Sequence, residues 1–173
     1  MKKALMVVLV GLTCCALLTS CGPMVYVHKD PAFSIANPGW EKTKYVSLPD
    51  AYFGQAVPPY GSPGIYVYKN DPPMTSKTTP QIYAKNLCKR INNDQYQKAS
   101  KCKVLEAKKT QLSDGTPAVE GEISYFNGVY AVNAYAGFVG AKKGKTDIGV
   151  ILFSGTNKMS EEYKNYMRSL IIE

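Results

Sequence analysis

The chain has 173 residues, of which 45% are hydrophobic and 20% are charged, and it carries a formal net charge of +8. These values fit one compact domain with a hydrophobic core, and they exclude a disordered chain or a protein built mainly of membrane-spanning helices. The basic balance favours anionic neighbours, such as acidic lipid headgroups, lipopolysaccharide or cell-wall polymers.

The first 20 residues have the layout of a bacterial lipoprotein signal peptide. Lys2 and Lys3 precede an apolar run from residue 4 to residue 18, which is shorter than the roughly 20 residues of a membrane-spanning helix. The last residue of this run and the three that follow it, Leu18-Thr19-Ser20-Cys21, resemble a lipobox. This resemblance implies that Cys21 is lipidated and becomes the new N-terminus. Two or more acyl chains give stable anchoring. The alternative is ordinary cleavage that leaves Cys21 as a free thiol.

Cleavage at this point fixes the expected domain boundaries and compartment. We expect residues 1–20 to be removed, 21–31 to form a tether and 32–173 to form the domain, outside the cytoplasm. The mature chain keeps 19 Lys and Arg against 13 Asp and Glu, a net charge of +6. Gly22 stands where an aspartate would oppose outer-membrane sorting, so a Gram-negative host would favour the outer membrane.

The first half of the domain shows two strand signals and one helix signal. F-S-I-A-N-P-G-W, residues 33–40, alternates as a strand does and offers Trp40 as a core anchor. Residues 64–69, G-I-Y-V-Y-K, predict a second strand. Thr79 and Pro80 predict the start of a helix. The apolar stripe of this helix consists of Tyr83, Ala84, Leu87, Cys88 and Ile91.

The second half predicts four strands and a closing helix. The strand-like segments are 101–112, 118–126, 129–140 and 147–153, and the last is apolar on both faces, as expected of a central strand covered on both sides. Asn127-Gly128 predicts a two-residue hairpin turn. Ser160 predicts a helix cap, followed by a buried face of Tyr163, Tyr166, Met167, Leu170 and Ile171.

The segment G-A-K-K-G-K-T, residues 140–146, ends like a phosphate-binding loop. A true loop of this kind needs its first glycine at position 139, which is a valine, and it leads into a helix, whereas a strand follows here. We therefore predict no nucleotide site and a solvated hairpin tip that carries Lys142, Lys143 and Lys145.

Two cysteines remain for the domain once the signal and the lipidated residue are set aside. Cys88 and Cys102 form an even pair in an oxidising compartment, which favours a disulfide. Bridging them closes a loop of about 15 residues, worth about 3 kcal/mol in the chain-entropy model. The alternative is two buried thiols packed as small hydrophobic groups.

Tyrosine is abundant, with 13 residues, and three of these lie in or beside loops rich in proline and glycine. Tyr52, Tyr60 and Tyr66 are therefore candidates for a contact surface, because rigid amphipathic rings commonly make protein or glycan contacts. The alternative is that these rings staple their own loops onto the domain.

Three segments carry a family resemblance: F-S-I-A-N-P-G-W, then L-S-D-G-T-P-A at residues 112–118, and Y-M-R-S-L at residues 166–170. With the order of predicted elements, residues 33–173 resemble the PsbP-like superfamily, which includes PsbP, the Ran-binding protein Mog and DcrB-type bacterial lipoproteins. The resemblance implies an α+β fold, in which an antiparallel sheet has helices on both faces as an α/β/α sandwich. It also implies a docking module without a shared catalytic centre.

The function predicted from these features is that of a lipid-anchored, non-enzymatic module that binds a protein or an envelope polymer. We expect no cofactor, metal or nucleic acid, and the single histidine, His28 in the tether, excludes a His-dependent triad in the domain. An alternative is a small cell-wall glycan hydrolase that uses Glu120 and Glu122, which lie two apart on a predicted strand, about 7 Å by strand rise. A third possibility is an adhesion or phage-receptor surface.

Overall fold

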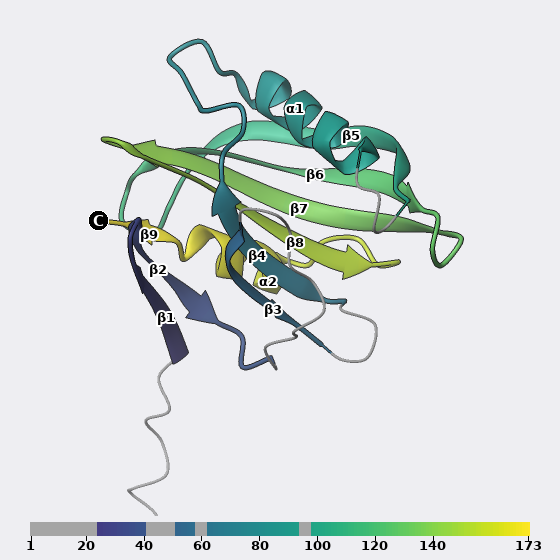
Figure 1. Ribbon diagram of the computed structural model, residues 1–173, viewed down its shortest axis with the longest axis horizontal. Coiled ribbons are helices and arrows are strands. Elements are labelled where there is room, and N and C mark those ends of the chain that lie inside the picture. The colour runs from purple at the N-terminus through teal and green to yellow at the C-terminus, as the bar shows by residue number, and fades with distance from the viewer. Residues whose placement is uncertain (1–23, 41–50, 58–61, 94–97) are drawn as a thin grey trace, which may run out of the picture.

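The computed structural model describes residues 24–40, 51–57, 62–93 and 98–173, and Figure 1 shows how their elements are arranged. In chain order, the described elements are β1 (Met24–Lys29), β2 (Ala32–Asn37), β3 (Ala51–Ala56), β4 (Gly64–Lys69), α1 (Pro80–Asn92), β5 (Ser100–Gln111), β6 (Pro117–Asn127), β7 (Val132–Lys143), β8 (Thr146–Gly155), α2 (Glu161–Arg168) and β9 (Ile171–Ile172). They form a six-stranded antiparallel sheet, in the order β3-β4-β8-β7-β6-β5, and a three-stranded sheet, β1-β2-β9.

Helix α1 covers one face of the six-stranded sheet. Thr79 caps it by accepting a hydrogen bond from the backbone N–H of Ile82, and Pro80 is its first residue, as the sequence predicts. Its buried stripe packs onto β5 and β6. The core on this side contains Tyr66, Tyr68, Tyr83, Leu87, Ile123, Phe138, Ile151 and Phe153.

Helix α2 and the three-stranded sheet cover the opposite face. Ser160 caps α2, and Glu161 and Glu162 occupy the first turn, where negative charge stabilises the helix dipole. Trp40 is half-buried and packs edge-on against Tyr163. The core on this side contains Phe33, Ile35, Phe53, Val67, Val150, Leu152, Met167, Leu170 and Ile172.

The α+β architecture with helices on both faces agrees with the expectation from the sequence. Strand β8 lies between β4 and β7, and residues 148–153 are buried on both faces, as expected of a central strand. The three-stranded sheet was not expected. Residues 21–31 were assigned to a tether, whereas Met24–Lys29 form β1, which pairs along its whole length with β2.

Two further expectations are wrong in detail. Ile171 was placed on the buried face of the last helix, but α2 ends at Arg168, and Ile171 begins β9 with its side chain 38% exposed. The Asn127-Gly128 hairpin has a four-residue loop, because Asn127 still pairs with Val132 in the ladder. The side-chain oxygen of Asn127 accepts hydrogen bonds from backbone N–H groups of this loop, which stabilises the longer turn.

Candidate functional site: a basic edge held by a disulfide

Positive charge is concentrated in one segment of the folded chain. Residues 80–111, which include α1 and β5, contain 8 of the 19 Lys and Arg that follow Cys21, but only 2 of the 13 Asp and Glu. This segment therefore carries a net charge of +6, and the remainder of the chain after Cys21 is balanced. We call the outer side of α1 together with β5 the basic edge, and its exposed lysines are Lys85, Lys89, Lys98, Lys101, Lys103, Lys108 and Lys109.

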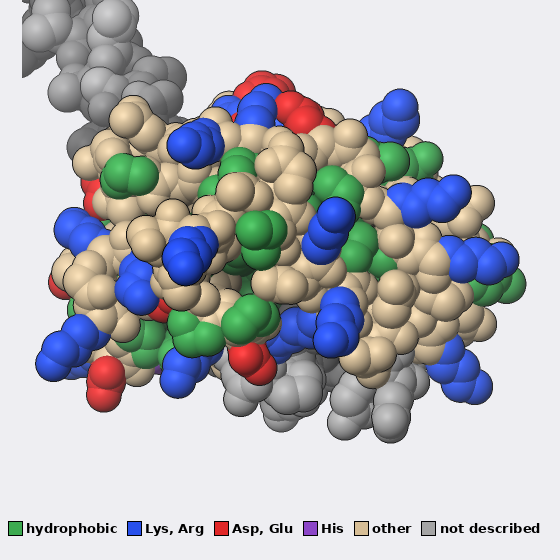
Figure 2. Space-filling model, turned by 90° about the horizontal axis from the view of Figure 1, so that it is seen from above, with side chains coloured by type: hydrophobic (Ala, Val, Ile, Leu, Met, Phe, Trp, Pro, Cys, Tyr) green, Lys and Arg blue, Asp and Glu red, His purple; other side chains and the backbone are tan. Residues whose placement is uncertain are grey.

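The basic edge faces solvent above the six-stranded sheet. Figure 2 views the molecule from this side, where Lys and Arg side chains are spread over the surface and outnumber acidic ones. Lys108 pairs with Glu106 at 2.7 Å, but within the described residues no ion pair involves Lys85, Lys89 or Lys103. These charges are thus available to an anionic partner.

Strand β5 is an edge strand, hydrogen-bonded to β6 on one side. It is 12 residues long and has irregular register with β6 near both Cys102 and Leu105. Lysines and bulges on an edge strand oppose pairing with a second copy of the same chain, because like charges would face each other. An acidic partner would not meet this repulsion.

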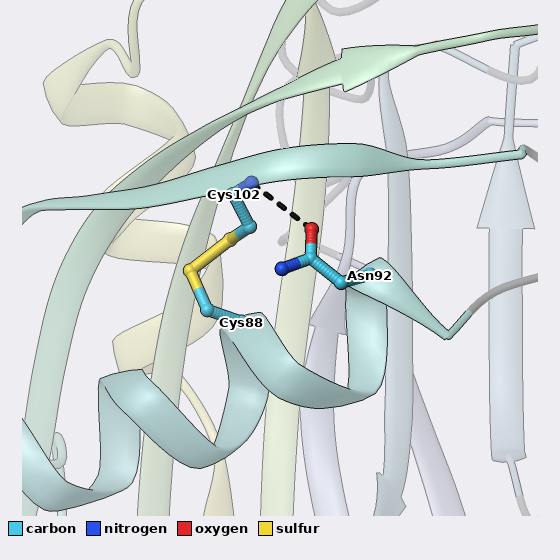
Figure 3. Close-up of a disulfide and its surroundings, with 3 residues drawn as sticks. All are labelled: Cys88, Asn92 and Cys102. Carbon is cyan, nitrogen blue, oxygen red and sulfur yellow. Dashed lines mark hydrogen bonds between the residues drawn. A yellow bond between two sulfur atoms is a disulfide. The ribbon is translucent and has the colours of Figure 1, made fainter.

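A disulfide between Cys88 and Cys102 joins α1 to β5 (Figure 3). The backbone N–H of Cys102 also donates a 3.0 Å hydrogen bond to the side chain of Asn92, at the end of the helix. Near the start of the helix, the side-chain amide of Gln81 donates to the carbonyl of Ala107 at 3.1 Å. These links fix the lysines of the helix relative to those of the strand, so the charge pattern is preorganised.

A buried polar chain lies beneath α1. The hydroxyls of Tyr68 and Tyr83 are 3.2 Å apart, and the Tyr83 hydroxyl donates to Asn70 at 2.7 Å. The amide of Asn70 in turn donates to Asp147 at 2.5 Å. Burial raises the pKa of both tyrosines, so both stay neutral at physiological pH. The guanidinium carbon of Arg90 lies 4.8 Å from the ring centre of Tyr68, over its face.

The predicted tyrosine surface is wrong for Tyr66. Its side chain is 1% exposed and packs edge-on against Phe153, at 5.8 Å between ring centres. The reason is that both faces of β4 are covered: Tyr66 lies in the core on the α1 side of the sheet, and its neighbours Ile65 and Val67 lie in the core on the opposite side. Tyr52 is half-buried, and its ring lies 5.3 Å from that of His28. Tyr60 and the lipidation candidate Cys21 lie outside the described residues.

The lysine tip is a hairpin, as the sequence predicts, and the structure gives it a two-residue loop, with Lys143 paired to Thr146 and Gly144 at a φ of +60°. Two of its lysines also bind the body of the domain. Lys142 donates to the carbonyl of Met74 at 3.0 Å, and Lys143 donates to the carbonyl of Ile172 at 2.6 Å. The tip is thus partly a structural element.

Glu120 and Glu122 lie on one face of β6, as their spacing predicts, and the carboxylate of Glu122 accepts a 3.3 Å hydrogen bond from the backbone N–H of Met159. Arg168 of α2 binds Glu120 through two hydrogen bonds, of 2.6 and 2.8 Å. Burial by itself raises the pKa of Glu120, but the hydrogen bonds and charge of Arg168, with the charge of Lys108, lower it overall. A general acid needs a raised pKa, so this arrangement favours a structural ion pair that fastens α2 to β6.

Two further searches concern the described residues alone. Among them, no group of three or more His, Cys, Asp or Glu side chains is placed to hold a metal ion. No helix among them has the length and apolar character that crossing a membrane requires.

Comparison with known proteins supports the fold. No family model and no curated protein match the chain. Among solved structures, it is similar to the solution structure of cyanobacterial PsbP (CyanoP) from Synechocystis sp. PCC 6803, with a TM-score of 0.58 over 90% of this chain and 99% of that chain. The fold is PsbP-like. At 14% sequence identity, the likeness concerns the fold alone.

Proposed function

We propose that this PsbP-like protein is a lipid-anchored docking module outside the cytoplasm, which presents its basic edge to an anionic partner. The observation that carries this proposal is the concentration of the whole net charge of the mature chain in residues 80–111. The seven lysines of this segment are exposed, and the disulfide holds the helix that carries two of them against the strand.

The position of the anchor supports this role. The lipidation candidate Cys21 precedes the first residue of β1 by three positions, and β1 belongs to the sheet that lies across the core from α1 (Figure 1). Acyl chains on Cys21 would hold the β1 side of the domain toward the membrane. The basic edge would then face away from the membrane, toward partners in the surrounding compartment.

The chemistry of the basic edge fits a phosphate-bearing or carboxylate-bearing envelope polymer, or an acidic protein surface. Exposed lysines attract such partners over roughly 8 Å at physiological ionic strength, and this attraction weakens as salt rises. An acidic extended segment could also pair with the free side of β5. No catalytic step is required for either mode.

The test of the basic edge uses charge reversal with a control of equal net charge. The variant carries Lys85→Glu and Lys89→Glu on α1, and the control carries Lys69→Glu and Lys158→Glu, which are exposed and lie outside residues 80–111. We expect the first pair to reduce retention on native envelope polymers by at least about tenfold more than the second pair. Equal losses would show that net charge, and not the basic edge, determines binding.

Capture in native membranes identifies the partner directly. A photoreactive residue at Ile82, which is 46% exposed on the outer side of α1, should crosslink the partner, and the same residue at Thr156 should not. The anchor is tested by Cys21→Ser, which should release the protein from membranes. If this variant fractionates with membranes as firmly as the natural chain, the lipid anchor is not what holds it.

A further inference from the structure

We propose that the outer face of the three-stranded sheet β1-β2-β9 rests on the lipid bilayer and sets the orientation of the domain. This inference depends on the lipid anchor of the proposed function and names the membrane as a second contact of the domain. We call this surface the seating face, and its residues are Val25, Val27, Ala32, Ser34, Ala36 and Ile171.

The alternation of the strands defines the seating face. Tyr26 and His28 point to the core, where their rings stack on Phe53 at 4.1 Å and on Phe33 at 5.0 Å. The alternate residues Val25 and Val27 therefore face outward, and their exposed fractions are 56% and 61%. Moving exposed valine side chains from water into an apolar phase has a favourable free energy, so these residues favour contact with lipid.

The pairing register places the outward residues in one continuous surface. Val27 pairs with Ser34, and Ser34 pairs in turn with Ile171, so these three residues form a row across the sheet. The neighbouring outward positions on β2 are alanines, which keep the surface flat. Charged residues stand only at one end of this surface: Lys29 pairs with Ala32 from β1, and the backbone N–H of Glu173 donates to the carbonyl of Ala32 from the other side. Both side chains are exposed, so they can stay in the headgroup region while the uncharged residues meet the lipid.

The distance from the lipidated position identifies the occupant as a bilayer. Three residues span at most about 10 Å when fully extended, so acyl chains on Cys21 confine the start of β1 to that distance from the lipid–water interface. At this distance the anchor keeps lipid close to the seating face, so a weak contact between the two forms as an intramolecular step at high effective concentration. A second copy is a poor alternative, because six mostly small residues fall well short of the 20–30 residues a side of a stable interface.

The seating face is too small to bind membranes without the anchor. We therefore expect the Cys21→Ser chain not to float with vesicles, whereas the lipidated chain floats in one orientation. The prediction is thus about orientation. Because the anchor alone already brings the β1 side of the domain near the membrane, the decisive comparison is between the natural seating face and a variant of this face that keeps the anchor.

The experiment attaches a fluorophore to the cysteine of an Ile171→Cys variant of the lipidated chain. The labelling leaves the Cys88–Cys102 disulfide intact. The vesicles consist of phosphatidylethanolamine and phosphatidylglycerol. Some of the lipids carry a nitroxide quencher near the headgroup. The matched control is Leu105→Cys, on the basic edge, with a side chain that is 49% exposed. We expect quenching at least about twofold stronger at position 171 than at position 105. Adding Val25→Asp and Val27→Asp should remove this difference without preventing flotation.

The possible outcomes separate this inference from the anchor on which it rests. Equal quenching at both positions in a chain that floats would overturn the seating face and leave the anchor standing. Failure of the lipidated chain to float would overturn both. Efficient disulfide dimerisation of Ile171→Cys without lipid would assign the face to a second copy of this chain and would also overturn the inference.

Discussion

The disulfide that joins α1 to β5 should contribute about 3 kcal/mol to the free energy of unfolding. Cys88 and Cys102 are separated by 14 positions, so the bridge closes a loop of about 15 residues, and the chain-entropy model gives about 3 kcal/mol for that length. Replacing both cysteines with alanine removes the bridge. For a domain of this size, the loss should lower Tm by about 6–12 °C. Urea denaturation in oxidising buffer measures the difference in free energy.

Reduction of the natural chain is the control for this prediction. Dithiothreitol opens the bridge but keeps both sulfur atoms in place, so it separates the effect of the crosslink from the packing of Cys88, which is 8% exposed. We expect most of the loss to appear on reduction, and the double variant to be insensitive to dithiothreitol. A difference below about 1 kcal/mol would refute the reasoning, because the loop would then already be restricted in the unfolded chain.

Three further predictions concern an ion pair and two glycines. Glu120→Gln should lower the free energy of unfolding by about 2–3 kcal/mol in urea denaturation, because Arg168 loses a buried partner while its own side chain, 25% exposed, keeps some contact with water; an unchanged midpoint would contradict this. Because the pKa of Glu120 is lowered on folding, the pair stabilises the domain above the unfolded pKa of about 4.3 and loses this effect as pH falls through the folded pKa. Acid titration should therefore bring the natural chain and the Gln variant together, and curves that stay parallel would refute the assignment. Gly149→Ala should cost about 3 kcal/mol, at the upper end of the usual range for overpacking, because its Cβ would lie 2.5 Å from the ring of Tyr68. Gly144→Ala, in open space at a φ of +60°, should cost only about 1–2 kcal/mol, and calorimetry that ranks the two variants in the opposite order would contradict both estimates.

The candidate site was partly visible in the sequence and was missed there. The excess of basic residues over residues 80–111 can be counted without a structure. Counted over the whole chain, the same lysines look evenly spread, which is typical of a surface that only keeps a protein in solution. The structure shows that α1 and β5 are adjacent and that a disulfide connects them, so one stretch of sequence becomes one surface.

One error of the sequence analysis and one of its open alternatives concern residues whose partners are distant in the chain. Tyr66 lies beside a proline-rich loop, which suggests a surface position, but the core packed on its face of the sheet, Phe153 included, buries it. Glu120 and Glu122 suggest an acid pair by their spacing alone, and the structure adds Arg168, 48 positions away from Glu120, as a hydrogen-bond partner of that carboxylate at 2.6 Å. In each case the deciding partner is distant in the chain.

The sequence by itself determined the local features of this protein: the caps at Thr79 and Ser160, the apolar stripe of α1, the alternating strands and the hairpin tip around Gly144. These features depend on interactions within a few residues, so they can be recognised in a single segment. Only the tertiary structure decided that residues 24–29 form a strand, which faces of β4 are buried and where the net charge gathers. Those outcomes depend on which segments pair and cover one another. The pairing depends on how much apolar surface the whole chain buries, which no single segment shows.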